Sequence, residues 1–129
     1  KKEMRGHLAN RLTSALYREA VYLVSEGVAD VEDVDTVVSN GPGLRLALLG
    51  PHMNYHLGGG EGGYRYYLEH LGPSQEIRWK TLGQSPLTPE LKEKLIHGIE
   101  SQNPNMSELK TKRDNGLIKI LKIKKENKL

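Results

Sequence analysis

Residues 58–64, GGGEGGY, have the glycine spacing of a phosphate-binding loop. Gly58, Gly60 and Gly63 satisfy G-x-G-x-x-G, in which glycines let the backbone approach the pyrophosphate of a dinucleotide. Such a loop follows a strand and opens a helix, because the strand aims the phosphate at the helix N-terminus. Residues 50–57, GPHMNYHL, contain no run of Val or Ile and do not have the pattern of a strand. The fingerprint alone therefore does not predict a nucleotide site, and we expect these glycines to serve another purpose.

His52 and His56 could place two imidazoles on the same side of a helix, because they are four residues apart. A metal site would need a third ligand at a recognisable spacing, and no nearby residue supplies one. The chain also has no Cys, which excludes disulfides and thiolate metal sites. No metal site is predicted.

Asn10 lies in the interior of a predicted helix, where Asn has poor helix propensity. A rotation of about 100° per residue places Asn10, Ser14 and Tyr17 on one side, away from the apolar stripe that includes Leu8 and Leu12. A side-chain amide both donates and accepts hydrogen bonds, so it can bind a hydroxyl or carbonyl group of a ligand. The alternative is an ordinary surface or interhelical hydrogen bond, which position alone favours.

Helices account for the whole pattern of the chain, because apolar residues recur at helical spacing and no segment shows sustained strand alternation. The predicted segments are 4–25, 31–40, a short helix after Pro51, 64–71, a helix from Pro89 and a last helix from Ser107. In the last helix, Leu109, Leu117, Ile120, Leu121 and Ile123 are expected to point inward. The fold class is therefore all-α, without an internal repeat.

Start and stop signals set the predicted boundaries of these helices. Gly27 should stop the first helix, and Asp30 is a suitable N-cap for the second. Thr88 followed by Pro89 is a strong helix start. Residues 41–51, GPGLRLALLGP, are expected to form a turn-rich connector, and Gly72-Pro73 is expected to break or bend the chain.

The charge is distributed unevenly. Residues 110–129 carry eight Lys or Arg against two acids, a net charge of +6, whereas residues 1–109 carry eleven against fourteen, a net charge of −3. A basic tail could contact nucleic acid or an anionic membrane, but Lys is also favoured near a helix C-terminus. No aromatic residue follows Lys80 to stack on bases, so nucleic-acid binding is not predicted.

The sequence contains no recognisable targeting signal. No apolar stretch approaches the ~18 residues of a membrane span, and no signal peptide opens the chain. The lack of Cys suits a reducing compartment, so a cytoplasmic protein without a membrane partner is expected. The chain begins KKEMRG without an initiator Met, and we expect it to be part of a longer protein.

Residues 6–35, GHLANRLTSALYREAVYLVSEGVADVEDVD, resemble the opening of the C-terminal helical domain of the L-3-hydroxyacyl-CoA dehydrogenase family. The resemblance comprises a Gly, an apolar pair, Asn-Arg-Leu, a long helix, Glu-x-Gly and an acid-capped helix with Asp-x-Asp. The matching positions are Gly6, Asn10, Arg11, Leu12, Glu19, Glu26, Gly27 and Asp35. One departure is His7, where most of the family has Phe.

The following segments extend this resemblance. Residues 39–51 are similar to the family's Gly-x-Gly…Gly-Pro segment, and residues 56–64, HLGGGEGGY, most resemble the carnitine dehydrogenase branch. Members of that branch oxidise the 3-hydroxyl of L-carnitine with NAD. The resemblance implies a dimerising helical bundle of the type found in the C-terminal domain of 6-phosphogluconate dehydrogenase. It implies that NAD, the catalytic base and the acid belong to an N-terminal Rossmann domain absent from these 129 residues, so that the chain alone is inactive.

The resemblance assigns a role to Asn10, and the chemistry of carnitine suggests roles for other residues. The family's counterpart of Asn10 orients the reacting oxygen of the substrate, and Ser14 lies beside it on the predicted helix. Arg45 is a candidate partner for the carboxylate of carnitine, although a surface ion pair is the alternative. Tyr64 and Trp79 belong to an aromatic group that could hold a trimethylammonium by cation–π attraction, or could instead form a core or dimer interface.

We accordingly expect residues 1–80 to form the core of the family's C-terminal domain, and residues 81–129 to add helices and the basic tail. The expected function is substrate binding and homodimerisation within a carnitine 3-dehydrogenase. One alternative is a dehydrogenase for a 3-hydroxyacyl-CoA or another small 3-hydroxy acid. An alternative of a different class is a non-catalytic helical dimerisation or interaction module.

Overall fold

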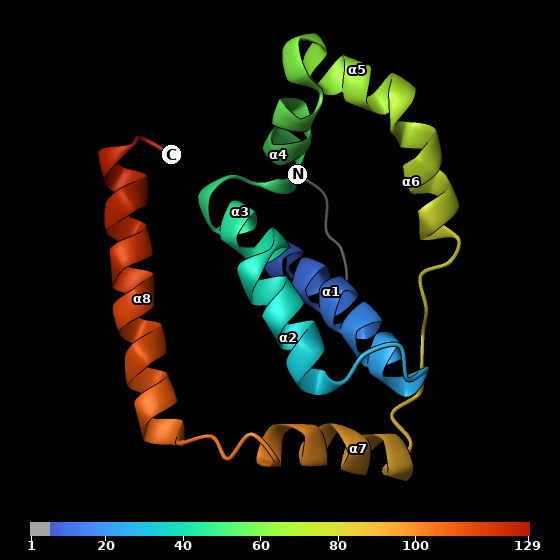
Figure 1. Ribbon diagram of the computed structural model, residues 1–129. Coiled ribbons are helices and arrows are strands. Elements are labelled where there is room, and N and C mark those ends of the chain that lie inside the picture. Colours follow the sequence, from blue (N-terminus) through green and yellow to red (C-terminus); the bar gives the residue numbers. More distant parts are fainter. Residues whose placement is uncertain (1–5) are drawn as a thin grey trace. The chain divides into compact units, whose positions relative to one another are not determined.

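The computed structural model describes residues 6–129, and every regular element in that range is a helix (Figure 1). The predicted all-α class is confirmed. In chain order the elements are α1 Leu8–Ser25, α2 Val31–Asn40, α3 Pro42–Leu48, α4 Pro51–Gly58, the 3-10 turn η1 Gly60–Gly62, α5 Gly63–His70, α6 Gly72–Trp79, α7 Pro89–Glu100 and α8 Met106–Glu126.

The chain forms two compact units that interleave along the sequence. The first unit comprises the residues up to Val34 together with Thr81–Gln102, and therefore contains α1 and α7. The second unit comprises Asp35–Lys80 and Asn103–Leu129, and contains α3 to α6 with α8.

The C-terminal half of α1 is the centre of the first unit. Val21 and Val24 of α1 are buried, as is Leu91 of α7. Polar contacts hold the segment after Thr81 against α1: the Gly83 N–H donates to Glu19 Oε2 at 2.8 Å, and the Ser25 and Ser85 hydroxyls lie 2.6 Å apart. These contacts join residues that are 60 or more positions apart in the sequence, so they close the unit.

The ends of α1 follow from its glycines. Gly27 has a φ of +69°, and the Val28 N–H donates to the Leu23 carbonyl at 3.0 Å, which closes the helix in a Schellman motif. The predicted stop at Gly27 is confirmed. The helix begins at Leu8, after Gly6 with a φ of +80°, whereas the predicted start at Met4 lies outside the described residues.

The predicted caps of α2 and α7 are confirmed. The Asp30 carboxylate accepts from the Asp33 N–H at 2.8 Å, and the Thr88 hydroxyl accepts from the Leu91 N–H at 3.2 Å. Glu90 accepts from its own backbone N–H and from the Thr88 hydroxyl, and these bonds lower the pKa of its carboxyl below the ordinary 4.5. The last helix begins one residue before the predicted Ser107, because the Asn105 side chain caps it.

The segment 41–51 is not the predicted turn-rich connector, because it contains α3. Pro42 occupies the first turn, where its missing N–H costs nothing, and the Leu and Ala residues that follow are strong helix formers. The Asn54 amide then donates to the Leu49 carbonyl at 2.7 Å and the Gly50 carbonyl at 3.1 Å, beyond the end of α3. Gly and Pro therefore mark the two ends of a short helix.

Two apolar faces are exposed within this chain, and for α8 this contradicts the prediction that its apolar residues point inward. Leu8 and Leu12 of α1 are 75% and 59% exposed, and Leu117 and Leu121 of α8 are 51% and 64% exposed. Helical spacing places apolar residues on one face, but a neighbouring element must cover that face before it is buried. Across residues 6–129 no helix is both long enough and apolar enough to cross a lipid bilayer.

Candidate functional site

Asn10 and Ser14 lie together on one exposed face of α1, as their spacing predicts. Both line a shallow hollow whose other lining residues are Gly6, Arg11, Ala15 and Arg18. Among residues 6–129 the Asn10 side chain has no hydrogen-bond partner, so both its donor and its acceptor are available to a ligand. This face can bind a hydroxyl or carbonyl oxygen.

Two arginines that the sequence analysis did not assign to a site line the same hollow. Arg11 follows Asn10 directly, and Arg18 is one turn beyond Ser14. Guanidinium groups bind carboxylates in a bidentate manner, so this face is suited to a substrate that carries both an oxygen function and an anion. The same helical spacing that groups Asn10 with Ser14 would have found Arg18.

Arg45 occupies a different place, on α3 in the second unit. Its side chain is exposed, and its carbonyl accepts from the Leu49 N–H at 2.9 Å at the end of the helix. Asn10 belongs to the first unit, so the structure does not bring Arg45 and Asn10 together within one unit. Its assignment as a carboxylate partner remains a prediction.

Tyr64 and Trp79 do lie together, in a hollow of about 200 Å³ within the second unit. The hollow forms where α4, α5 and α6 meet. Only Leu71 separates α5 from α6, and the chain bends there, as predicted for Gly72-Pro73 (Figure 1). Its lining consists of Pro51, His52, Tyr55, Tyr64, Tyr67, Leu68, Gly72, Gln75 and Trp79. The pairing of Tyr64 with Trp79 was expected from their density in the sequence, whereas the contributions of His52 and Gln75 were not.

The aromatic rings of this hollow are ordered by contacts with one another. Tyr67, which is only 6% exposed, stacks on Tyr55 with ring centroids 4.5 Å apart and also lies nearly parallel to Tyr64 at 6.1 Å. The His52 ring stands at 70° to Tyr64. Such offset-stacked and edge-on arrangements are the favoured geometries of aromatic pairs.

The glycine loop joins α4 to α5 by a close backbone approach. A Cβ on Gly59 would lie 1.8 Å from the Gly63 carbonyl oxygen, and Gly60 and Gly63 both have a φ of +59°. The element before the loop is the helix α4, so the strand that a dinucleotide loop requires does not precede it. The glycines therefore allow the turn between two helices, which is a purpose other than phosphate binding.

His52 and His56 both take part in this turn. His52 Nδ1 lies 2.9 Å from the Tyr64 hydroxyl, and the Tyr64 N–H donates to His56 Nδ1 at 3.0 Å. The part of the chain that the structure describes contains no group of three or more His, Cys, Asp or Glu side chains that could hold a metal ion. The imidazoles instead connect α4 to Tyr64.

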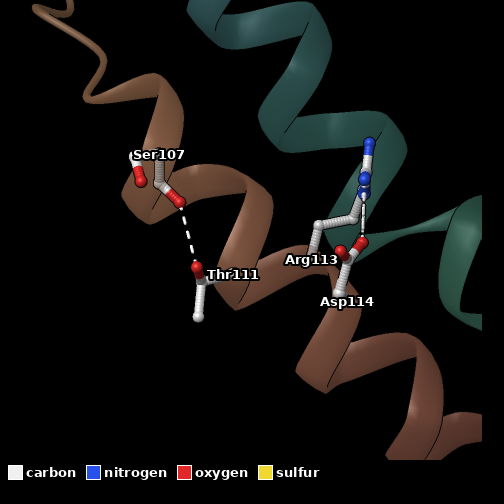
Figure 2. Close-up of polar contacts among 4 residues, drawn as sticks. All are labelled: Ser107, Thr111, Arg113 and Asp114. Carbon is white, nitrogen blue, oxygen red and sulfur yellow. Dashed lines mark hydrogen bonds and ion pairs between the residues drawn. The ribbon is translucent and has the colours of Figure 1, made fainter.

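The basic tail forms α8, where several of its cations have partners. Figure 2 shows the Arg113 guanidinium turned onto Asp114, with its Nη2 2.8 Å from the carboxylate, and the Thr111 hydroxyl donating to the Ser107 carbonyl. Lys112 pairs with Glu108 at 2.6 Å. Lys124 donates to the Leu48 carbonyl at 2.7 Å, at the C-terminal end of α3. These contacts support a structural role for part of the positive charge.

The chain is similar in sequence to a known family of proteins. Residues 6–99 match the sequence profile described as the C-terminal domain of 3-hydroxyacyl-CoA dehydrogenase. Three similar relatives are L-carnitine dehydrogenases. Over 94% of the present chain, 43% of residues are identical to the enzyme of Bacillus cereus. The identity is 43% over 93% of the chain for Oceanobacillus iheyensis and 44% over 92% for Staphylococcus epidermidis.

The match covers only part of these relatives, because the chain spans 38%, 40% and 37% of their respective lengths. The family profile nevertheless covers most of the chain, and the resemblance predicted from Asn10, Gly27 and the glycine loop is confirmed. The chain belongs to the 3-hydroxyacyl-CoA dehydrogenase family and corresponds to its C-terminal domain.

Proposed function

We propose that this chain is the substrate-binding and dimerising domain of an NAD-dependent dehydrogenase that oxidises the 3-hydroxyl of L-carnitine to 3-dehydrocarnitine. The observation that carries the proposal is 43% identity to an L-carnitine dehydrogenase along 94% of the chain. The proposal includes a cytoplasmic location, which suits a chain without Cys.

In this proposal NAD is bound outside the present chain. The described residues do not fit a dinucleotide, because the only G-x-G-x-x-G spacing in them follows a helix and closes a tight turn between α4 and α5. The catalytic acid and base are likewise assigned to a second domain of the complete protein. The contribution of this chain is then to hold the substrate in a reactive orientation, which accounts for a large part of many enzymatic rate enhancements.

Asn10 is the residue that we assign to orientation of the reacting oxygen. Its amide lies on an exposed helix face, one turn from the Ser14 hydroxyl, so two polar groups are available to the same ligand. A rigid helix is a suitable support for such groups, because a misplacement of about 1 Å is costly in catalysis.

Arginine side chains are assigned to the carboxylate of carnitine. Arg45 is the predicted partner, because a guanidinium can bind a carboxylate through two hydrogen bonds. Arg18 is a second candidate because it lines the same hollow as Asn10. A carboxylate partner would also favour carnitine over a 3-hydroxyacyl-CoA, whose thioester replaces the carboxylate.

The dimer in this proposal is supported by exposed apolar side chains. Leu8 and Leu12 on α1, and Leu117 and Leu121 on α8, are each more than half exposed within one chain. Exposed apolar side chains on a helix face are typical of interaction sites, and a second copy related by a twofold axis is the commonest partner of a soluble chain.

The proposal is tested by steady-state kinetics of the complete polypeptide that contains this chain, with NAD reduction measured on L-carnitine and on a 3-hydroxyacyl-CoA. We expect a higher kcat/KM for L-carnitine. A preference for the thioester would instead identify the rival dehydrogenase. Activity on neither substrate, together with no dinucleotide-binding sequence before Lys1 in the natural polypeptide, would leave a helical dimerisation module.

A further inference from the structure

We propose that the aromatic hollow between α4, α5 and α6 is a binding site for a quaternary ammonium group. The inference rests on the proposed function in one respect, because carnitine is the compound expected to bring that group. Its physical basis is independent of the reaction: an aromatic ring attracts a cation within ~6 Å of its centroid, and this attraction is strongest where water is excluded.

The lining of the hollow is rich in aromatic rings and contains no carboxylate, Lys or Arg among the described residues. Tyr55, Tyr64, Tyr67 and Trp79 supply four rings, and no Asp, Glu, Lys or Arg is among the residues that line it. A quaternary ammonium has no N–H to donate, so it needs no carboxylate partner, whereas a primary ammonium would need acceptors for its hydrogens. Because none of these lining residues is Lys or Arg, the wall has no permanent positive charge that would repel the ligand.

The tyrosine hydroxyls are already engaged by neighbouring side chains. The Tyr64 hydroxyl lies 2.9 Å from His52 Nδ1, and Gln75 donates to the Tyr67 hydroxyl at 2.6 Å. These bonds fix the orientation of both rings before any ligand arrives. Preorganised side chains lose less entropy on binding. Tyr67 is 6% exposed and stacks on Tyr55, so it supports the other rings, and the ring faces left for recognition belong to the more exposed Tyr55, Tyr64 and Trp79.

The size of the hollow suits a group rather than a whole cofactor. Its volume of about 200 Å³ lies below the ~300–1,000 Å³ of sites that enclose a drug-sized ligand. Trp79 is 63% exposed and therefore lies at the rim, where it can cover a bound headgroup while the rest of the ligand extends outward. The competing occupant is a second copy of the chain, which the experiment below distinguishes.

The test uses Trp79, which is the only Trp in the 129 residues. Choline chloride is titrated into the protein while the emission of Trp79 is recorded, with sodium chloride as the ionic-strength control. The matched probe is the neutral carbon analogue of choline, in which a tert-butyl group replaces the trimethylammonium. We expect a saturable change with choline and a binding constant at least severalfold weaker for the neutral analogue, because only the cation gains cation–π attraction.

Three substitutions locate the response. Tyr64→Leu removes a ring and should weaken choline binding about tenfold, equivalent to ~1.4 kcal/mol. Tyr64→Phe keeps the ring and loses only the bond to His52, so it should bind choline within a few-fold of the unmodified protein. Tyr66→Leu is the matched control, because Tyr66 is 48% exposed on α5 and is not among the residues that line the hollow. Circular dichroism tests whether each variant is folded. If Tyr64→Leu does not fold, Tyr55→Leu replaces it as the ring-removal variant.

Equal responses to choline and to its neutral analogue would overturn the proposal, as would unchanged choline affinity in the folded ring-removal variant. Emission that changes with protein concentration but not with choline would assign the hollow to a contact between copies, and would also overturn it. Choline binding without carnitine oxidation by the complete protein would leave the site standing and refute the proposed function. Carnitine oxidation without choline binding would support the proposed function and refute the site.

Discussion

Replacement of Asn10 by Ala in the complete enzyme separates a catalytic role from a structural one. Asn10 is exposed on α1 and has no hydrogen-bond partner among residues 6–129, so its removal leaves no buried group unsatisfied. Ala is the better helix former, by ~0.5 kcal/mol. The structure therefore predicts that the Asn10→Ala protein is as stable as the original or slightly more stable.

The activity of the Asn10→Ala enzyme should fall although its stability does not. A hydrogen bond from the Asn10 amide to the reacting oxygen is expected to stabilise the transition state by roughly 2–3 kcal/mol, and its loss corresponds to a decrease of about a hundredfold in kcat/KM. Most of the loss should fall on kcat if the bond strengthens in the transition state, whereas a rise confined to KM would mean ground-state binding.

The matched control is Asn115→Ala, the same chemical change on an exposed position of α8. It gains the same helix propensity and should leave kcat and KM unchanged. Thermal unfolding of both variants, followed by circular dichroism, accompanies the kinetics. A folded Asn10→Ala enzyme with the kcat and KM of the original would refute the assignment and leave α1 as a scaffold.

Three further outcomes are expected. Calorimetric titration of the 129-residue chain with NAD should show no binding, because its glycine loop joins two helices; stoichiometric binding at micromolar affinity would contradict this. Sedimentation equilibrium should show a dimer that Leu12→Glu weakens, since Leu12 is 59% exposed; a monomer at all concentrations would exclude that interface. Thr88→Ala should destabilise α7 by ~1 kcal/mol and raise the pKa of Glu90 toward 4.5, as measured by NMR titration. Because folding lowers the pKa of Glu90, the contribution of its carboxylate to stability is present above about pH 4.5 and is lost as the pH falls through the folded pKa. If the stability of the original protein and that of Thr88→Ala fell equally with pH in this range, the hydrogen bond between Thr88 and Glu90 would be refuted.

Helix ends were predictable because their causes are local. The Gly27 stop and the Asp30 and Thr88 caps each depend on backbone groups within a few residues, so the sequence contains everything that determines them. The α3 helix was not predicted, because Gly and Pro at both ends of 41–51 are typical of turns, although the Leu and Ala residues between them favour a helix.

Burial was the less predictable property, because it depends on what packs against a face. The spacing of Leu8 and Leu12 correctly indicates one face of a helix, but it does not say which element covers that face. The same distinction applies to the candidate site. Periodicity placed Asn10 with Ser14, whereas the bond between His52 and Tyr64 joins residues twelve positions apart and depends on how α4 turns into α5.

That turn explains why glycines are concentrated at residues 58–63. With a side chain at Gly59, the backbone of Gly63 could not approach, and with one at Gly63 the His56 ring would lie only 2.7 Å from the new Cβ. The His56 ring occupies that position because it accepts from the Tyr64 N–H at the start of α5. The glycines thus let two imidazoles of α4 reach Tyr64, one at its backbone and one at its hydroxyl. A spacing that resembles a phosphate cradle instead sets the position of an aromatic ring, and the chemistry available at this turn is that of the ring.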